Sequence, residues 1–242
     1  MRRHVQVILL ALTGIGLLHA ALFTDLYLRY VKEGLRPLLI ISGVLLLLLA
    51  VAGAATGRGH TAHADRAHGH DHSRAPRIAW LLFLPALSLL FYAPPALGAY
   101  TAARSNDKTV KEHKGFDPLP ATSPLPMTLT DFTSRVQQDR ALAIKNRTVQ
   151  MTGFATPAGR GNGWYLTRII FTCCAADSQS VKVRMYTTTA PPADSWLTVT
   201  GTWHPRGRLG TKTAEAALDV RTIRHVFPPV NAYTDDLPLT PS

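Results

Sequence analysis

The chain has 242 residues, enough for one ordinary domain or for a membrane region that carries a small domain. Its 26 Lys and Arg against 15 Asp and Glu give a formal net charge of +11, but no run concentrates the basic residues into a stripe that would follow a phosphate backbone. We therefore expect no nucleic-acid partner, and contact with membrane lipid explains the surplus better. The two cysteines cannot build a disulfide framework, so any soluble part needs its own apolar core.

Three long apolar stretches, residues 5–23, 37–56 and 78–97, lie within residues 1–100. Each has about twenty residues, which at ~1.5 Å per residue crosses a hydrocarbon core of ~30 Å, so we predict three transmembrane helices in a multi-pass protein of the cell membrane. The first apolar run is long for a secretory signal and a second follows soon, so we expect it to be retained. Three spans after a basic N-terminus predict an extracytoplasmic C-terminal domain, although the basic residues on the two sides nearly balance.

The loop at residues 57–77, between the second and third predicted spans, is rich in histidine and lacks apolar periodicity. Gly, Ala and His in alternation cannot pack into a core, so we expect no ordered structure there unless a ligand binds. Neutral imidazoles beside carboxylates suit zinc or another transition metal such as nickel or copper. No strict four-ligand spacing is present, so the loop is either a weak metal-handling segment or a solvated linker. Its candidate ligands are His60, His63, His68, His70 and His72.

Residues 101–127 form a predicted Pro-rich linker, because closely spaced prolines keep a chain extended. A soluble domain is predicted at residues 128–230, and residues 231–242 are expected to be a disordered tail. The domain begins with a short helix at 130–140, for which Thr130 is the expected N-cap.

Five strands are predicted after this helix, because apolar and polar residues alternate between turn signals. Their ranges are 147–152, 164–173, 181–186, 196–203 and 218–226. Gly201 marks an expected bulge, and the second strand looks long enough to serve both halves of a barrel. Five short strands in so few residues predict a small all-β, OB-like five-stranded barrel. Basic strand residues are expected to face solvent: Arg168, Lys182 and Arg184.

Cys173 and Cys174 are adjacent at the end of the predicted second strand, and three interpretations of the pair remain open. As core residues, one would be buried and the other exposed, because adjacent strand side chains point to opposite faces. As a disulfide, the pair would be strained and redox-active, because neighbouring Cα atoms lie only about 3.8 Å apart. As a metal site, the two thiolates would bind a soft ion together with Asp177 or with a distant His204 or His225. No CxxC motif is present, which excludes a mechanism of the thioredoxin type.

The segments FTCCAAD, PPALGA and LRYVKEGLRPLL resemble the YcgQ-like family of uncharacterised bacterial membrane proteins, usually encoded beside a predicted multi-span permease. The resemblance implies an exposed C-terminal domain and a permease partner, and it implies no established activity. Residue patterns for a hydrolase or a nucleotide enzyme are absent from the sequence. The leading hypothesis is therefore a non-catalytic accessory subunit of a membrane transport system that presents its cysteine pair to an ion or to the permease. The alternatives are a membrane-tethered thiol-redox protein and a structural anchor with an inert barrel.

Overall fold

A computed structural model gives the structure of the chain. It describes residues 2–55, 97–105, 112–113, 115–158, 163–187 and 189–237. The chain divides into two compact units, one made of Met1–Leu18 with Ile41–Ala96 and the other of His19–Ile40 with Leu97–Ser242. The predicted third span and the histidine-rich loop at 57–77 lie outside the described residues, except that Leu97 is included.

Two long apolar helices make up the described part of the first unit and continue a few residues into the second. Helix α1 (Arg2–Leu22) and helix α2 (Arg36–Ala55) match the first two predicted spans to within a few residues, and both are long and apolar enough to cross a membrane. Glycines bring the two helices close together, since a Cβ on Gly14 would lie 2.9 Å from the carbonyl oxygen of Gly43. Small residues at such a contact are typical of helix pairs in lipid.

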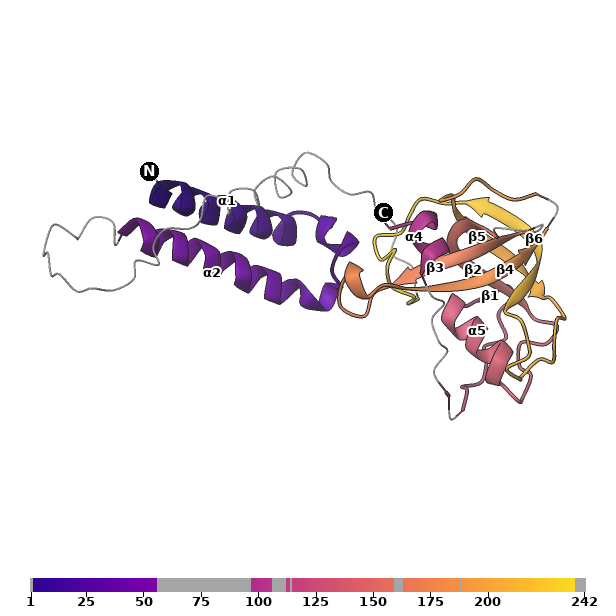
Figure 1. The fold of residues 1–242 in the computed structure, drawn as a ribbon. Coiled ribbons are helices and arrows are strands. Elements are labelled where there is room, and N and C mark those ends of the chain that lie inside the picture. The colour runs from indigo at the N-terminus through magenta and orange to yellow at the C-terminus, as the bar shows by residue number, and fades with distance from the viewer. Residues whose placement is uncertain are drawn as a thin grey trace, which may run out of the picture. The chain divides into compact units, whose positions relative to one another are not determined.

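Six strands form one mixed sheet in the second unit (Figure 1). The sheet order is β1-β2-β3-β4-β6-β5, and an additional β2–β5 pairing returns it to β2. The β1–β2 and β4–β6 pairings are parallel and the others are antiparallel. The strands are β1 (Leu125–Pro126), β2 (Thr148–Pro157), β3 (Trp164–Ile170), β4 (Gln179–Tyr186), β5 (Trp196–Trp203) and β6 (Ala217–His225).

The expectation of a clean five-stranded barrel is wrong in two respects. The sheet has a sixth strand, β1, and the strand shared by both halves is β2 rather than β3. β2 pairs with β5 up to Phe154 and with β3 from Phe154 onward, so its partner changes at that residue. Gly153 precedes the change, and a Cβ there would lie only 2.6 Å from the carbonyl oxygen of Thr167. A glycine is therefore required where β2 bends between its two partners.

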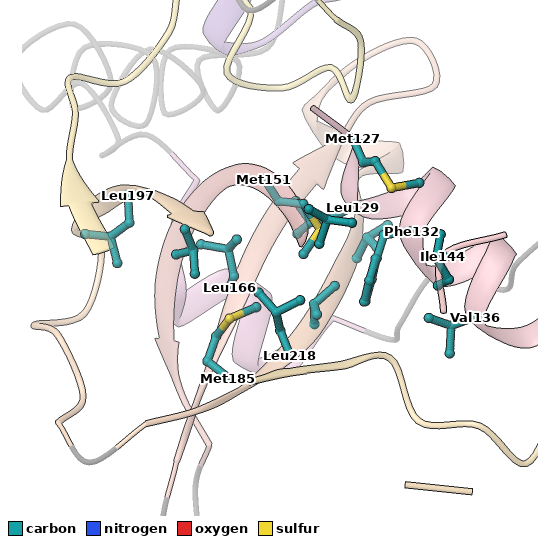
Figure 2. Packing of buried hydrophobic residues seen from close by; sticks show 14 of the residues in the cluster. Met127, Leu129, Phe132, Val136, Ile144, Met151, Leu166, Met185, Leu197 and Leu218 are labelled. Carbon is teal, nitrogen blue, oxygen red and sulfur yellow. The ribbon is translucent and has the colours of Figure 1, made fainter. Parts of the chain in front are cut away.

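The predicted strand alternation is confirmed on the inner face of the sheet, and the bulge at Gly201 appears as a register shift between Thr200 and Gly201. Helix α5 (Leu129–Gln138) packs against β4, and its N-cap is Thr128 rather than the predicted Thr130, because the Thr128 hydroxyl accepts a 3.0 Å hydrogen bond from the Asp131 N–H. Figure 2 shows the core that the helix and the strands share. Its members include Leu129, Phe132, Val136, Met151, Leu166, Met185, Leu197 and Leu218.

Part of the predicted linker and part of the predicted tail pack onto the domain. Leu125 and Met127 are core residues, and Arg147 donates to the carbonyl oxygens of Pro120 and Thr122 at 2.6 and 3.0 Å. At the other end, Tyr233 is buried, and its hydroxyl donates a 3.1 Å hydrogen bond to the carbonyl oxygen of Leu97. These segments pack onto the domain because they contain apolar side chains whose burial is favourable. The linker was predicted from its proline content and the tail from its position in the chain, and neither feature reveals that burial.

A second, smaller core covers the other face of β3, where the sequence predicted solvent. It is built from helix α4 (Ala99–Arg104), Phe154 of β2, Ile169 of β3, Phe171 just after β3, and Tyr233. Arg168 was expected to face solvent but is fully buried, and it lies on the opposite face of β3 from Ile169, since it pairs with Val181 of the main core. Its guanidinium donates to the carbonyl oxygens of Asn231 and Thr234, and burial lowers the pKa of Arg168 to about 10, opposed by Asp235 and Asp236. β3 is thus buried on both faces, because α4 and the C-terminal segment cover its outer side.

Candidate metal centre at the cysteine pair

The cysteine pair lies in a turn and not in a strand. β3 ends at Ile170, and the turn leads into a short 3-10 helix, η5 (Ala175–Asp177). The carboxylate of Asp177 closes the turn by accepting three backbone hydrogen bonds, from Thr172 at 3.1 Å, Cys173 at 2.7 Å and Cys174 at 3.2 Å. A short acidic side chain that bonds nearby N–H groups is a common way to fix a turn. This segment, residues 171–177, is called the cysteine loop below.

Both thiols are free and accessible. Cys173 is exposed and Cys174 is half-buried, so the core interpretation, with one cysteine buried, is wrong. Its physical basis fails because β3 has ended, and side chains in a turn do not alternate between two faces of a sheet. The two Sγ atoms are 3.7 Å apart, whereas a disulfide bond is about 2.05 Å long, so the structure holds the reduced pair.

The side chains converge as metal ligands do. One ligand atom each of Cys173, Cys174 and Asp177 lies within 4.8 Å of the others, and among the described residues this is the one such group of three or more. Two sulfurs bound to a tetrahedral ion at about 2.3 Å each lie about 3.8 Å apart. The observed Sγ–Sγ distance of 3.7 Å therefore already suits an ion held between the two thiolates.

The electrostatics of the loop favour a bound cation. A hydrogen bond to Asp177, a second one to Cys174 and the nearby negative charge raise the pKa of Cys173 to about 11. Desolvation acts to raise the pKa of Asp177, but backbone and thiol hydrogen bonds from Cys173, Cys174 and Thr172 outweigh it and lower the pKa. Asp177 is thus charged at neutral pH while Cys173 keeps its proton. A soft cation that displaces this proton would be held by a thiolate beside an existing carboxylate.

The cysteine loop is paired with the segment that connects α1 to α2. This segment, residues 23–35, is called the connector and contains the short helices η1 (Leu26–Arg29) and η2 (Glu33–Leu35). Val31 forms an antiparallel bridge with Cys174, closed by hydrogen bonds from Lys32 N–H to the Cys173 carbonyl oxygen at 3.0 Å and from Ala175 N–H to the Tyr30 carbonyl oxygen at 2.8 Å. Sequence reasoning missed this pairing, because a single bridge between distant loops leaves no periodic signal.

The other predicted ligands do not join this group. His60, His63, His68, His70 and His72 lie outside the described residues. Nδ1 of His204 lies 2.7 Å from Asp219, and the His204 ring stacks on Tyr186 with centroids 3.8 Å apart. Neither His204 nor His225 belongs to the group that contains the cysteines. The structure therefore brings together Cys173, Cys174 and Asp177 of the predicted set.

The fold and the site define a class of protein: a small mixed-sheet domain with an accessible dithiol and carboxylate, joined to two apolar helices. Residues 132–234 match the family model described as the DUF1980 C-terminal domain, a range that includes the cysteine loop. The match is consistent with the resemblance to an uncharacterised bacterial family, and it confirms neither the YcgQ-like name nor the permease neighbour. No curated protein matches the chain. No solved structure matches it.

Proposed function

We propose that this protein is a non-catalytic, membrane-anchored accessory subunit of a permease or other transport system, and that its C-terminal domain binds a soft metal ion through Cys173 and Cys174. The observation that carries the proposal is the convergence of two free thiols, 3.7 Å apart, with the Asp177 carboxylate on an accessible loop. Thiolates select soft or borderline ions such as zinc or copper(I).

Exposure of the two long helices supports the membrane anchor. Only 11 % of the apolar stretch in each helix is buried within the protein. A helix from the core of a soluble protein would bury most of its apolar surface, whereas a helix that is apolar all round and uncovered fits a lipid environment. Membrane lipid is thus the proposed surrounding of α1 and α2, with the domain outside the cytoplasm.

The number of ligands supports a role in ion transfer. A structural zinc site is closed by four protein ligands, whereas this loop supplies two thiolates and one carboxylate that is already engaged by three backbone N–H groups. Open coordination positions allow a partner to supply the remaining ligands and then to take the ion. A permease subunit is the proposed partner for this exchange.

The sheet supports a binding role rather than a catalytic one. The pairing ring β2-β3-β4-β6-β5, with parallel β4 and β6, supports our proposal that the domain is OB-like, with β1 as an added strand. OB-like barrels commonly serve as binding modules. The cysteine pair, with Cys173 exposed and Cys174 half-buried, is the feature that this barrel would present.

The strongest alternative is a thiol-redox role, which the adjacent sulfurs favour. Oxidation would form a bond between Cys173 Sγ and Cys174 Sγ, with two protons and two electrons passing to a thiol oxidant. The raised pKa of Cys173 disfavours this role, because the thiolate is the reactive form in disulfide exchange. An inert structural anchor is the third possibility, and it requires no ligand at the loop.

The test is the metal content of the full chain purified in detergent and reduced. Wild type and Thr172→Ser, a control that keeps both thiols, should bind about one equivalent of a soft ion. The double variant Cys173→Ser, Cys174→Ser should bind about one equivalent less than wild type while keeping its melting temperature. Equal metal content in the double variant would refute the proposal. A reversible loss of two hydrogens under mild oxidation, without metal binding, would establish the redox alternative.

A further inference from the structure

The bridge between the connector and the cysteine loop places the candidate ion site next to the segment that joins α1 to α2. Val31 pairs with Cys174, and hydrogen bonds on both sides of the bridge join Lys32 to Cys173 and Ala175 to Tyr30. All of these residues belong to the same compact unit. The cysteine loop is therefore attached to the short segment that directly joins α1 to α2.

The connector has the composition of a membrane–water interface. It exposes large apolar and aromatic side chains, with Phe23 78 % exposed and Leu26 53 % exposed. Basic side chains follow at Arg29 and Lys32, next to the acidic Asp25 and Glu33, and Arg36 begins α2 directly after the connector. Aromatic and basic residues are enriched at the headgroup level, where an apolar body meets lipid and a positive charge meets phosphate.

The distance along the chain limits how far the ion site can lie from the ends of the helices. Val31 is five residues before Arg36, where α2 begins. Even a fully extended chain spans at most about 18 Å over five residues, and the 3-10 helix η2 within this stretch shortens the span. Cys174 is paired with Val31 across a spacing of about 5 Å, so it lies within about 23 Å of the first residue of α2.

We propose that the cysteine pair lies in the lipid headgroup layer, at the membrane surface reached by the connector and on the opposite side of the membrane from the N-terminus. The inference rests on the proposed membrane anchoring. The connector and the cysteine loop together form the face of the domain that contacts the bilayer surface. An ion bound at Cys173 and Cys174 is then exchanged at the bilayer surface, within reach of a membrane-embedded partner.

The topology follows from the same contact. α1 leads from the N-terminus to the connector, and α2 leads back. The domain lies on the connector side, because its cysteine loop is bonded to the connector.

The end of β4 that lies away from the cysteine loop offers a control position for measuring distance from the membrane. The cysteine loop adjoins the start of this strand, where Ile170 pairs with Gln179, whereas the β5–β6 loop adjoins its end, where Arg206 donates a 2.9 Å hydrogen bond to the Tyr186 hydroxyl. Eight strand residues at ~3.3 Å each separate the two ends by about 23 Å. A label at the exposed Arg208 in the β5–β6 loop therefore reports a position away from the cysteine loop.

The test uses the two native cysteines in the full chain reconstituted in vesicles. Cys174→Ser leaves Cys173 as the labelled thiol, and Cys173→Ser leaves Cys174 in a second preparation. The control carries Arg208→Cys in the double-serine background. A fluorophore is attached under mildly alkaline conditions, and its quenching by a phospholipid with a nitroxide on the headgroup is measured. We expect several-fold stronger quenching at Cys173 and Cys174 than at the Arg208→Cys control.

Sidedness is measured on the same protein in cells with a membrane-impermeant maleimide. Cys173 and a cysteine introduced by His4→Cys in the double-serine background should be labelled from opposite sides. Vesicle flotation reports anchoring separately. Flotation with equal quenching at all positions overturns the placement while the anchor stands, and failure to float overturns both. Strong quenching without metal binding overturns the ion site and leaves the placement intact.

Discussion

The carboxylate of Asp177 and the backbone N–H of Cys173 are joined by a 2.7 Å hydrogen bond, so one charged group both shapes the cysteine loop and lies beside its exposed thiol. A carboxylate in this position disfavours a second negative charge nearby. The loop therefore combines an accessible sulfur with low intrinsic reactivity. A thiol of this kind can bind an ion but reacts slowly as a nucleophile.

Cys173 should react slowly with iodoacetamide despite its exposure. A pKa of about 11 in place of 9.0 lowers the thiolate fraction at neutral pH about 100-fold, and the higher nucleophilicity of the more basic thiolate recovers part of this. We expect alkylation about 10-fold slower than for an ordinary exposed thiol. The measurement is the rate in Cys174→Ser, with Asp177→Asn in the same background as the comparison. An unchanged rate after Asp177→Asn would show that the carboxylate does not control the thiol.

The order of the cysteine loop should depend on pH in the acidic range. Hydrogen bonding lowers the pKa of folded Asp177, whereas an unfolded Asp has a pKa of about 3.9. The stabilisation from this carboxylate is therefore present above about pH 4 and is lost as the pH falls through the lower folded value. Amide exchange at residues 172–174 should accelerate in that window, and Asp177→Asn should remove the dependence. The exposed Asp117 provides the control, since Asp117→Asn should leave the profile unchanged.

Lys32→Pro should weaken the bridge between the connector and the cysteine loop without distorting the backbone. Lys32 has φ −67° and ψ 144°, which proline adopts readily, so the substitution removes the N–H that donates to the Cys173 carbonyl oxygen. One backbone hydrogen bond contributes about 1 kcal/mol, and we expect about fivefold faster exchange of the Ala175 amide. Lys32→Ala keeps the N–H and removes the charge. Equal exchange in the two variants would mean that the bridge contributes nothing to the loop.

Arg168→Leu should destabilise the domain and release its C-terminal segment. The guanidinium is fully buried and donates to the carbonyl oxygens of Asn231 and Thr234, and the substitution removes these hydrogen bonds, while Thr234 still donates to the Asn231 carbonyl oxygen. A lost partner of a buried polar group costs about 1–3 kcal/mol, so a loss of this size is expected in denaturant unfolding of the full chain. Proteolysis near residue 231 should become faster. Arg221→Ala, at an exposed site, should stay within about 0.5 kcal/mol of wild type.

Gly153→Ala should disrupt the point where β2 changes partners. The added Cβ would lie 2.6 Å from the Thr167 carbonyl oxygen, and backbone cannot move aside cheaply. We expect a loss of about 1–3 kcal/mol in unfolding free energy. Gly115→Ala is the matched control, because a Cβ there would meet nothing within 4 Å. Equal stability of the two variants would show that the bend does not depend on a glycine.

Local sequence patterns were sufficient to predict those helices and strands whose structure depends on residues close together in the chain. The alternation of Val181, Val183 and Met185 predicted an inward face that is confirmed, and the apolar runs predicted α1 and α2. Of the candidate site, the adjacency of Cys173 and Cys174 and the nearness of Asp177 were visible as spacing. These features depend on neighbours along the chain.

What the sequence could not reveal depends on contacts between distant segments. Arg168 looked like a solvent-facing strand residue, because nothing local shows that the distant carbonyl oxygens of Asn231 and Thr234 accept hydrogen bonds from it. β1 has only two residues and follows a Pro-rich stretch, so neither its length nor its composition indicated a strand. The bridge from Val31 to Cys174 joins segments far apart in the sequence and has no periodic signature.

The hydrogen bond from Tyr233 to Leu97 also bears on how the domain is made. It joins residues 136 positions apart, at the points where the chain enters the domain and where it leaves. The ring of Tyr233 stacks on Phe171, the first residue of the cysteine loop, with centroids 4.5 Å apart. The smaller core therefore cannot close until the ribosome has delivered Tyr233, long after the strands that it covers have been synthesised. The last step in forming the domain is consequently late in biosynthesis, and until then Arg168 lacks the carbonyl partners that its buried position requires.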